Sequence, residues 1–147
     1  MTKATDFDLE AFLPYRLAQA AEAVSLEFYQ LYRSRYAMTR PEWRVMAHLG
    51  QYGALTARDI CERASLHKTK VSRAVYALEQ RKWLKRGRDD GDRRFEWLEL
   101  TAAGRKTYDD LCREGLSLEA RLRTRLGADG AAQLLSLLHK LDDPAAA

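Results

Sequence analysis

Apolar residues recur at helical spacing soon after the start of the chain. They fall three or four positions apart, at Leu13, Leu17, Ala20, Val24, Phe28 and Leu31. Such a period places them on one face of an α-helix. Pro14 lies near the start of the pattern, where the missing N–H of proline costs no helical hydrogen bond. The pattern predicts a long helix from Leu13 to about Tyr36.

Two threonine-led motifs predict the starts of two shorter helices. The sequence Thr-Arg-Pro-Glu at 39–42 is a capping box with proline in the first turn, and Thr-Ala-Arg-Asp at 56–59 repeats it with the shorter aspartate. We expect the first of these helices to continue to Gly50 and the second to about Ala64.

A fourth helix is predicted after a short turn at 65–67 and continues to about Gln80. Val71, Val75 and Leu78 recur at i, i+4 and i+7, so they define its buried stripe. The opposite face carries hydrogen-bonding or cationic side chains, namely Thr69, Arg73, Tyr76 and Gln80, flanked by Lys70 and Ser72.

The pattern then changes to two short strands, at 83–88 and 94–100. The sequence Asp-Asp-Gly-Asp at 89–92 separates them and is typical of a turn, with Gly91 able to take a positive φ. Thr101 caps a second long helix, and a leucine-rich helix is predicted from Gly127 to Leu141.

Two helices joined by a short turn and followed by a basic two-stranded hairpin are the order of a winged helix-turn-helix. We therefore predict a mostly α (α+β) fold in which the fourth helix reads DNA. The alternative is an ordinary amphipathic surface helix. The hairpin that follows argues against that alternative.

The exposed face of the fourth helix offers two kinds of DNA contact. Arg73 and Thr69 suit base edges in the major groove, which offer acceptors and a thymine methyl group. Tyr76 completes the predicted DNA-binding face. Contacts to phosphates are assigned to three polar neighbours, namely Lys68, Lys70 and Ser72.

The hairpin carries a second candidate DNA contact, in the sequence Asp92-Arg93-Arg94. A narrow minor groove attracts arginine because its negative potential is enhanced, and Arg94 is the candidate for insertion. Asp92 would orient one of these arginines through a bidentate pair, or it is simply a turn-forming aspartate.

The distribution of charge supports a surface that meets phosphates. From Arg58 to Arg94 there are 12 Lys and Arg residues against 6 Asp and Glu, a net charge of +6, whereas the whole chain carries +4. A basic segment flanked by slightly acidic sequence is typical of a protein that binds nucleic acid with one face.

Other classes of protein find little support in the sequence. The three histidines, His48, His67 and His139, show no metal-ligand spacing, and neither a Gly-rich phosphate loop nor a nucleophile elbow is present, so we expect no enzyme, no metal and no cofactor. The first ten residues do not read as a signal peptide, and we expect a cytoplasmic protein. Cys61 and Cys112 are expected to be reduced thiols, although a redox role for either stays open.

Several segments together resemble the MarR family of regulators. They are Leu13-Pro-Tyr-Arg16, Pro41-Glu-Trp-Arg44, Thr69-Lys-Val-Ser-Arg73 and the stretch from Asp92 through Leu100-Thr101 to Gly104. The wing sequence is the specific part of the match, because a helix-turn-helix alone is common. At position 67, where many relatives have an acid or amide cap, this chain has His67, whose imidazole could cap the helix or meet a phosphate.

The resemblance implies a homodimer that binds a palindromic operator. It implies one domain over residues 1–147, with dimerisation helices at about 9–36 and 102–143 and a winged DNA-binding lobe at about 39–101. It also implies a pocket between the dimerisation helices and the lobe, occupied by an aromatic acid or a related lipophilic anion. Because this sequence has spare cationic groups, we include a coenzyme A thioester among the expected effectors.

Four residues are candidates for that pocket, namely Arg16, Trp43, Arg44 and His48. Three of them also have a plainer interpretation, with Trp43 in the core and Arg44 and His48 in solvent or at the dimer seam. The predicted function is a ligand-released repressor, and the alternative is an architectural DNA-binding protein without an operator. The sequence leaves open the effector, the operator and whether binding represses or activates.

Overall fold

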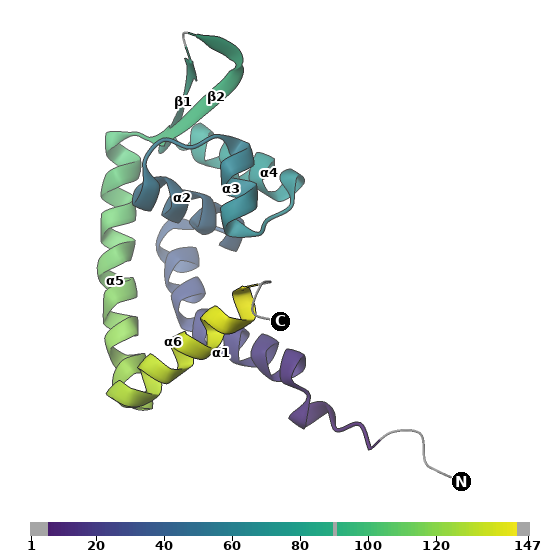
Figure 1. Ribbon diagram of the computed structural model, residues 1–147. Helices are drawn as coiled ribbons and strands as arrows, with labels where there is room; N and C mark the ends of the chain where they lie inside the picture. Colours follow the sequence, from purple (N-terminus) through teal and green to yellow (C-terminus); the bar gives the residue numbers. More distant parts are fainter. Residues whose placement is uncertain (1–5, 90, 144–147) are drawn as a thin grey trace. The chain divides into compact units, whose positions relative to one another are not determined.

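The computed structural model describes residues 6–89 and 91–143, with only the backbone at 89 and 92–94. Most of this described part is helical, and its one sheet is a two-stranded hairpin near the middle of the sequence (Figure 1). After a short 3-10 turn the elements are, in chain order, α1 (Leu13–Tyr36), α2 (Arg40–Tyr52), α3 (Ala57–Ala64), α4 (Lys68–Gln80), β1 (Leu84–Asp89), β2 (Asp92–Leu100), α5 (Ala102–Leu126) and α6 (Ala128–Asp142).

Both predicted capping boxes form. At α2 the Thr39 hydroxyl accepts from the Glu42 N–H at 3.3 Å, and the Glu42 carboxylate accepts from the Thr39 N–H at 3.1 Å. At α3 the two reciprocal bonds between Thr56 and Asp59 are both 3.1 Å. Each box satisfies two N–H groups that lack a partner within the helix, so the starts of α2 and α3 are set locally by sequence.

The hairpin is antiparallel, with Leu84 opposite Leu100 and Arg86 opposite Leu98. Its base is anchored in the lobe, because Leu84 and Leu98 are buried and Leu98 exchanges two backbone hydrogen bonds with Leu55, at 2.8 and 3.0 Å. β2 begins two residues earlier than the sequence predicted. Asp90 and the conformation predicted for the 89–92 turn lie outside the described residues.

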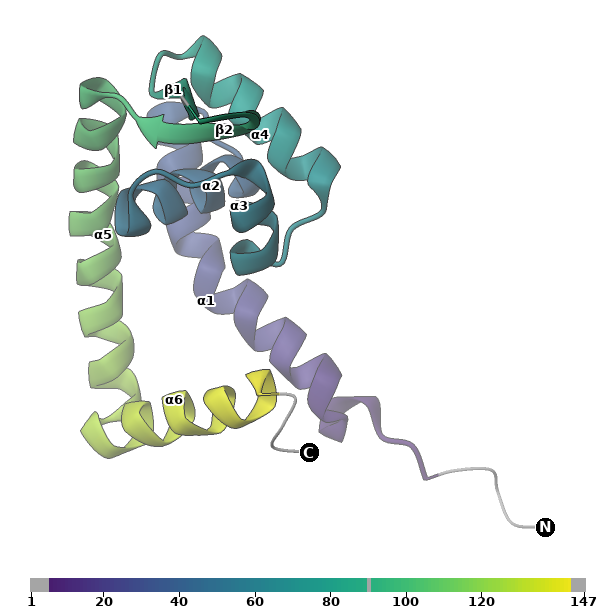
Figure 2. The same cartoon turned by 45° about the horizontal axis from the view of Figure 1, so that its top comes forward.

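The chain divides into two compact units, one ending at Tyr108 and the other beginning at Asp109. In the first unit, the core is formed by apolar side chains of α2, α3, α4 and the hairpin, namely Val45, Met46, Leu49, Ile60, Val71, Val75, Leu78, Leu84 and Leu98. The stripe predicted for α4 is therefore confirmed as its buried face. Two views of the ribbon show the hairpin leaving this core beside α4 (Figures 1 and 2).

The second unit consists of the last part of α5 and the whole of α6. Gly127 separates the two helices with a φ of 78°, a value that glycine adopts without a steric penalty. Its leucine side chains are largely exposed, with Leu137 at 57% and Leu141 at 56%. None of the described helices is long and apolar enough to span a membrane.

Candidate DNA-binding surface and effector site

The fourth helix presents its predicted polar face to solvent. Val71, Ala74, Val75 and Leu78 turn inward, and the opposite side is open. Every candidate DNA contact on this helix is exposed, namely Lys68, Thr69, Lys70, Ser72, Arg73 and Tyr76. A tyrosine that is 61% exposed on a packed helix is available to a partner, and Tyr76 is such a residue.

His67 is the N-cap of α4. Its Nδ1 accepts a hydrogen bond from the Thr69 N–H at 3.2 Å. A nitrogen that accepts this bond carries no proton, so the neutral ring has its proton on Nε2. Of the two roles that the sequence left open, the structure shows the capping one, and the side chain as a whole remains exposed.

Arg86 joins the hairpin to the fourth helix. Its Nε donates to Glu79 of α4 at 2.6 Å, and its Nη1 donates to Glu96 of β2 at 3.0 Å. Partial burial opposes the positive charge, but the two carboxylates outweigh it and raise the pKa of Arg86. No sequence motif indicates this cluster, because its three members lie on three different elements.

The other wing candidates are Asp92, Arg93 and Arg94. All three belong to β2, at the end of the strand away from the core. Their side chains lie outside the part of the chain that the structure describes. The roles assigned to them remain predictions.

Trp43 lies in an aromatic cluster that connects α1, α2 and the first turns of α5. Its ring stacks on Tyr32 at 6.0 Å and on Tyr108 at 6.3 Å, and Phe28 meets it edge-on at 5.1 Å. Burial raises the pKa of Tyr32 to about 12. Of these four rings only Trp43 was a predicted effector residue, because the rings come from distant parts of the chain.

Of the other three candidate effector residues, Arg44 interacts electrostatically with Tyr32 of this cluster, whereas the described part of the chain shows no contact of Arg16 or His48 with it. Arg44 is exposed and donates to the Ala64 carbonyl at 3.5 Å, while His48 Nδ1 lies 2.6 Å from the Arg44 carbonyl oxygen. Arg16 lies three helical turns before Phe28 on α1, a separation of about 18 Å. The structure therefore brings Arg44 and His48 together and leaves Arg16 apart from both.

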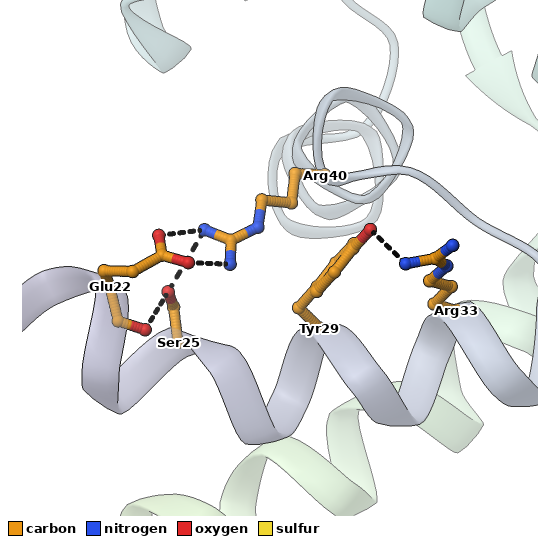
Figure 3. A network of polar contacts seen from close by, with 5 residues as sticks. All are labelled: Glu22, Ser25, Tyr29, Arg33 and Arg40. Carbon is orange, nitrogen blue, oxygen red and sulfur yellow. Dashed lines mark hydrogen bonds and ion pairs between the residues drawn. The ribbon is translucent and has the colours of Figure 1, made fainter.

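A second polar network fastens α1 to the start of α2 (Figure 3). Arg40 binds the Glu22 carboxylate with both terminal nitrogens, at 2.8 and 2.9 Å. Its guanidinium also lies over the Tyr29 ring, 4.6 Å from the centroid. Arg33 donates to the Tyr29 hydroxyl at 3.3 Å. These contacts link the long first helix to the helix that carries Trp43.

A groove of about 1200 Å³ lies between α3, α4 and the hairpin. Its apolar surface comes from Val71, Val75, Phe95 and Trp97, and both acidic and basic side chains line the rest of it. Phe95 is 50% exposed and Trp97 37% exposed, so these two rings are not core residues.

The helix-turn-helix formed by α3 and α4, with the hairpin beside it, defines a winged-helix DNA-binding protein. Residues 38–94 match the MarR family model. The chain is 28% identical to the uncharacterized HTH-type transcriptional regulator YwhA of Bacillus subtilis, over 62% of this chain and 66% of that protein. It is 26% identical to the HTH-type transcriptional regulator FarR of Neisseria gonorrhoeae, over 85% of each.

Two solved structures extend the likeness to nearly the whole chain. The MarR family regulator SPO1453 from Silicibacter pomeroyi is 26% identical with a TM-score of 0.81, and the match covers 92% of this chain and 96% of that one. NadR, solved with 4-hydroxyphenylacetate, is 24% identical with a TM-score of 0.80, over 98% and 99%. These comparisons support a MarR-family winged-helix transcriptional regulator, as the sequence motifs predicted.

Proposed function

We propose that the protein binds a specific operator with α4 in the major groove. The observation that carries this proposal is the division of α4 into a buried apolar stripe and an exposed face that includes Thr69, Arg73 and Tyr76. Arg73 and Thr69 would contact base edges, while Lys68, Lys70 and Ser72 would contact phosphates. The hairpin, with Arg94 at its outer end, would reach the adjacent minor groove.

The proposed active form is a homodimer on a palindromic site. Apolar side chains on α1 and α6 remain exposed in the single chain, with Leu13 at 57%, Val24 at 45% and Leu137 at 57%. Monomeric proteins rarely leave many large apolar side chains in solvent, so a second copy is the natural cover. Two lobes would then meet half-sites about one helical turn, roughly 34 to 36 Å, apart.

The proposed effector is an aromatic anion, either an acid or its coenzyme A thioester, that releases the protein from DNA. NadR, which shares this fold, was solved with an aromatic acid, 4-hydroxyphenylacetate. The aromatic cluster around Trp43 and Tyr108 offers ring-stacking surface, with the Arg105 guanidinium 5.3 Å from the Tyr108 centroid. Arg16 would add a cation from the second protomer, since it cannot reach this cluster in its own chain.

Footprinting on the DNA upstream of the protein's own gene tests the operator proposal. Protection of a discrete palindrome, by a dimer in which each lobe covers one half, is expected. Uniform coating of the fragment would favour the alternative, an architectural protein without an operator. A mass in dilute solution equal to one chain would contradict the dimer.

Calorimetry tests the effector proposal. Because coupling between two binding sites is reciprocal, operator DNA should lower effector affinity by the same factor by which effector lowers DNA affinity, typically about 5 to 150-fold. Candidate aromatic acids and their thioesters would be titrated into wild type and Arg16→Ala, with and without operator. Equal affinity for the DNA-bound and DNA-free dimer would overturn the release mechanism and leave the DNA-binding proposal intact.

A further inference from the structure

The Glu79–Arg86–Glu96 cluster places two acids beside the surface proposed to meet DNA. The side chains of Glu79 and Glu96 are 33% and 44% exposed, and one arginine is bound to both. The cluster therefore carries a net negative charge. Near a phosphate backbone such a charge weakens binding, because affinity rests on neutralising phosphates with cations. Electrostatics alone therefore predicts that the protein would bind DNA more tightly without this cluster.

Geometry gives the cluster a different role. Arg86 lies opposite Leu98 in the hairpin, on the face that carries the buried Leu84 and Leu98. It is thus placed where this face leaves the core. Its planar guanidinium binds one carboxylate on α4 and one on β2, and such charge-assisted pairs fix both distance and orientation.

A small rotation of the hairpin at the Glu79–Arg86–Glu96 cluster produces a larger movement at its outer end. Phe95 and Trp97, beyond the anchored base, are already half-exposed. Asp92 lies four residues from Glu96 along β2, which is about 13 Å at strand spacing. A rotation of about 10° at the cluster would therefore move the outer end by roughly 2 Å, enough to separate an arginine from its groove contact.

We propose that Glu79, Arg86 and Glu96 form a positioning clamp that sets the hairpin against the fourth helix, so that both elements can engage one half-site. The inference rests on the proposed DNA-binding function and adds residues that do not themselves contact DNA. Glu79 is the residue to test first, because it is the member of this cluster that lies on α4. The clamp raises operator affinity although its acids repel phosphates.

Glu79→Gln separates the two effects by the direction of the change. The substitution removes a negative charge near the proposed interface, so electrostatics alone predicts tighter binding to any DNA. The clamp predicts instead that operator affinity falls about tenfold, as for loss of one charge-assisted hydrogen bond. Affinity for random DNA should stay unchanged or rise slightly, because that binding depends on charge rather than register.

Glu99→Gln is the matched control. Glu99 lies on the same hairpin, is 49% exposed, and pairs with Lys85 at 3.4 Å inside the hairpin. Its loss removes the same charge without releasing α4. Operator affinity of this variant should equal or exceed that of wild type.

Arg86→Lys distinguishes a clamp from a direct phosphate contact. Lysine keeps the charge but lacks the planar fork, so a clamp predicts a loss close to that of Glu79→Gln, whereas a phosphate contact predicts near wild-type affinity. The double variant Glu79→Gln/Arg86→Lys should lose little more than either single variant, because both remove one interaction. Far-ultraviolet circular dichroism and thermal unfolding would show that each variant is folded.

The measurement is fluorescence anisotropy with labelled operator and with random duplex, over a series of salt concentrations. Weaker operator binding by Glu79→Gln, with Glu99→Gln unaffected, is the expected result. Glu79→Gln binding operator as tightly as Glu99→Gln would overturn the clamp. A wild-type protein that binds operator no better than random duplex would overturn the DNA-binding proposal instead, so the two failures are distinguishable.

Discussion

Arg81, which follows the last residue of α4, is hydrogen-bonded to the carbonyl oxygen of Tyr36, the last residue of α1. It also donates to the Ala37 carbonyl at 3.0 Å, and its guanidinium lies 4.7 Å from the Trp83 ring centroid. Carbonyls at a helix C-terminus have no partner within the helix, and a cation there complements the helix dipole. One side chain therefore joins the ends of the first and fourth helices.

Arg81→Ala is expected to lower the free energy of unfolding by about 1 to 3 kcal/mol, since it leaves two carbonyls without their charged donor. Urea unfolding followed by circular dichroism measures the loss. Arg81→Lys should recover only part of it, because an ammonium cannot bind both carbonyls and stack on indole in the same way. Equal stability of Arg81→Ala and wild type would contradict this account.

Gly104 approaches the backbone of Trp83 too closely for any larger residue. A Cβ at position 104 would lie 2.0 Å from the Trp83 carbonyl oxygen. Gly104→Ala should therefore lower the free energy of unfolding by about 1 to 3 kcal/mol or more, because overpacking destabilises a fold by this amount. Gly130→Ala is the control, since its Cβ would meet only Leu126 at 3.6 Å. Gly130→Ala, a substitution within a helix, should raise the free energy of unfolding by about 0.5 to 1 kcal/mol. In thermal unfolding, the midpoints of the two variants should therefore shift in opposite directions.

Lys82 has a φ of 61°, in the left-handed region that glycine adopts without penalty. A side chain in this conformation costs roughly 1 to 2 kcal/mol. Lys82→Gly is expected to raise the free energy of unfolding by about 0.5 to 1 kcal/mol, because part of the relief is offset by the greater freedom of glycine when unfolded. Lys82→Ala, which removes the charge but keeps the Cβ, should give no such gain. A gain of equal size in both variants would point to charge instead of backbone strain.

Asp59 contributes a pH-dependent part of the stability of α3. The N–H of Thr56 and then its hydroxyl hold the pKa of this carboxyl below its usual value. A depressed pKa in the folded state stabilises the fold above the ordinary aspartate pKa of about 3.9, and this contribution is lost as the pH falls through the folded value. Asp59→Asn should therefore show a shallower loss of stability below about pH 4 than wild type does. Parallel curves for the two proteins would exclude this role.

The sequence predicted what is encoded by neighbouring residues. Both capping boxes, the buried stripe of α4 and the hairpin were all readable, because each depends on spacing within a few positions. Glu22 and Arg40, which lie 18 residues apart, gave no such signal. The contact of Trp43 with Tyr108 gave no signal either. The positive φ at position 82 was also unpredictable, because the residue there is Lys82 and not a glycine.

In the candidate site, too, the features set by neighbouring residues were predictable and the contacts between distant residues were not. Exposure of Arg73 and Thr69 followed from the helical period, whereas the Arg86 cluster needed the folded hairpin to bring β1 and β2 beside α4. Effector residues were the hardest to predict. A pocket depends on rings and charges from distant segments. Arg16 lies far along α1 from the ring cluster around Trp43, although both residues were candidates for the one pocket that the family resemblance implies.

Two substitutions on α4 separate base contacts from phosphate contacts. Arg73→Ala should lower operator affinity by about 1 to 3 kcal/mol and relax the preference at one base pair, because a guanidinium that reads a guanine edge carries sequence information. Lys70→Ala should weaken operator and random duplex alike and reduce the salt dependence of binding by about one unit, as expected for one released counterion. Both residues are exposed and lie outside the buried stripe, so neither change should disturb folding. Competition binding against a set of single-base operator variants, repeated over a range of salt concentrations, measures both effects in one experiment. If Arg73→Ala kept the affinity and base preference of wild type, the face of the helix assigned to the bases would be wrong, and Tyr76 and Thr69 would be the next residues to test.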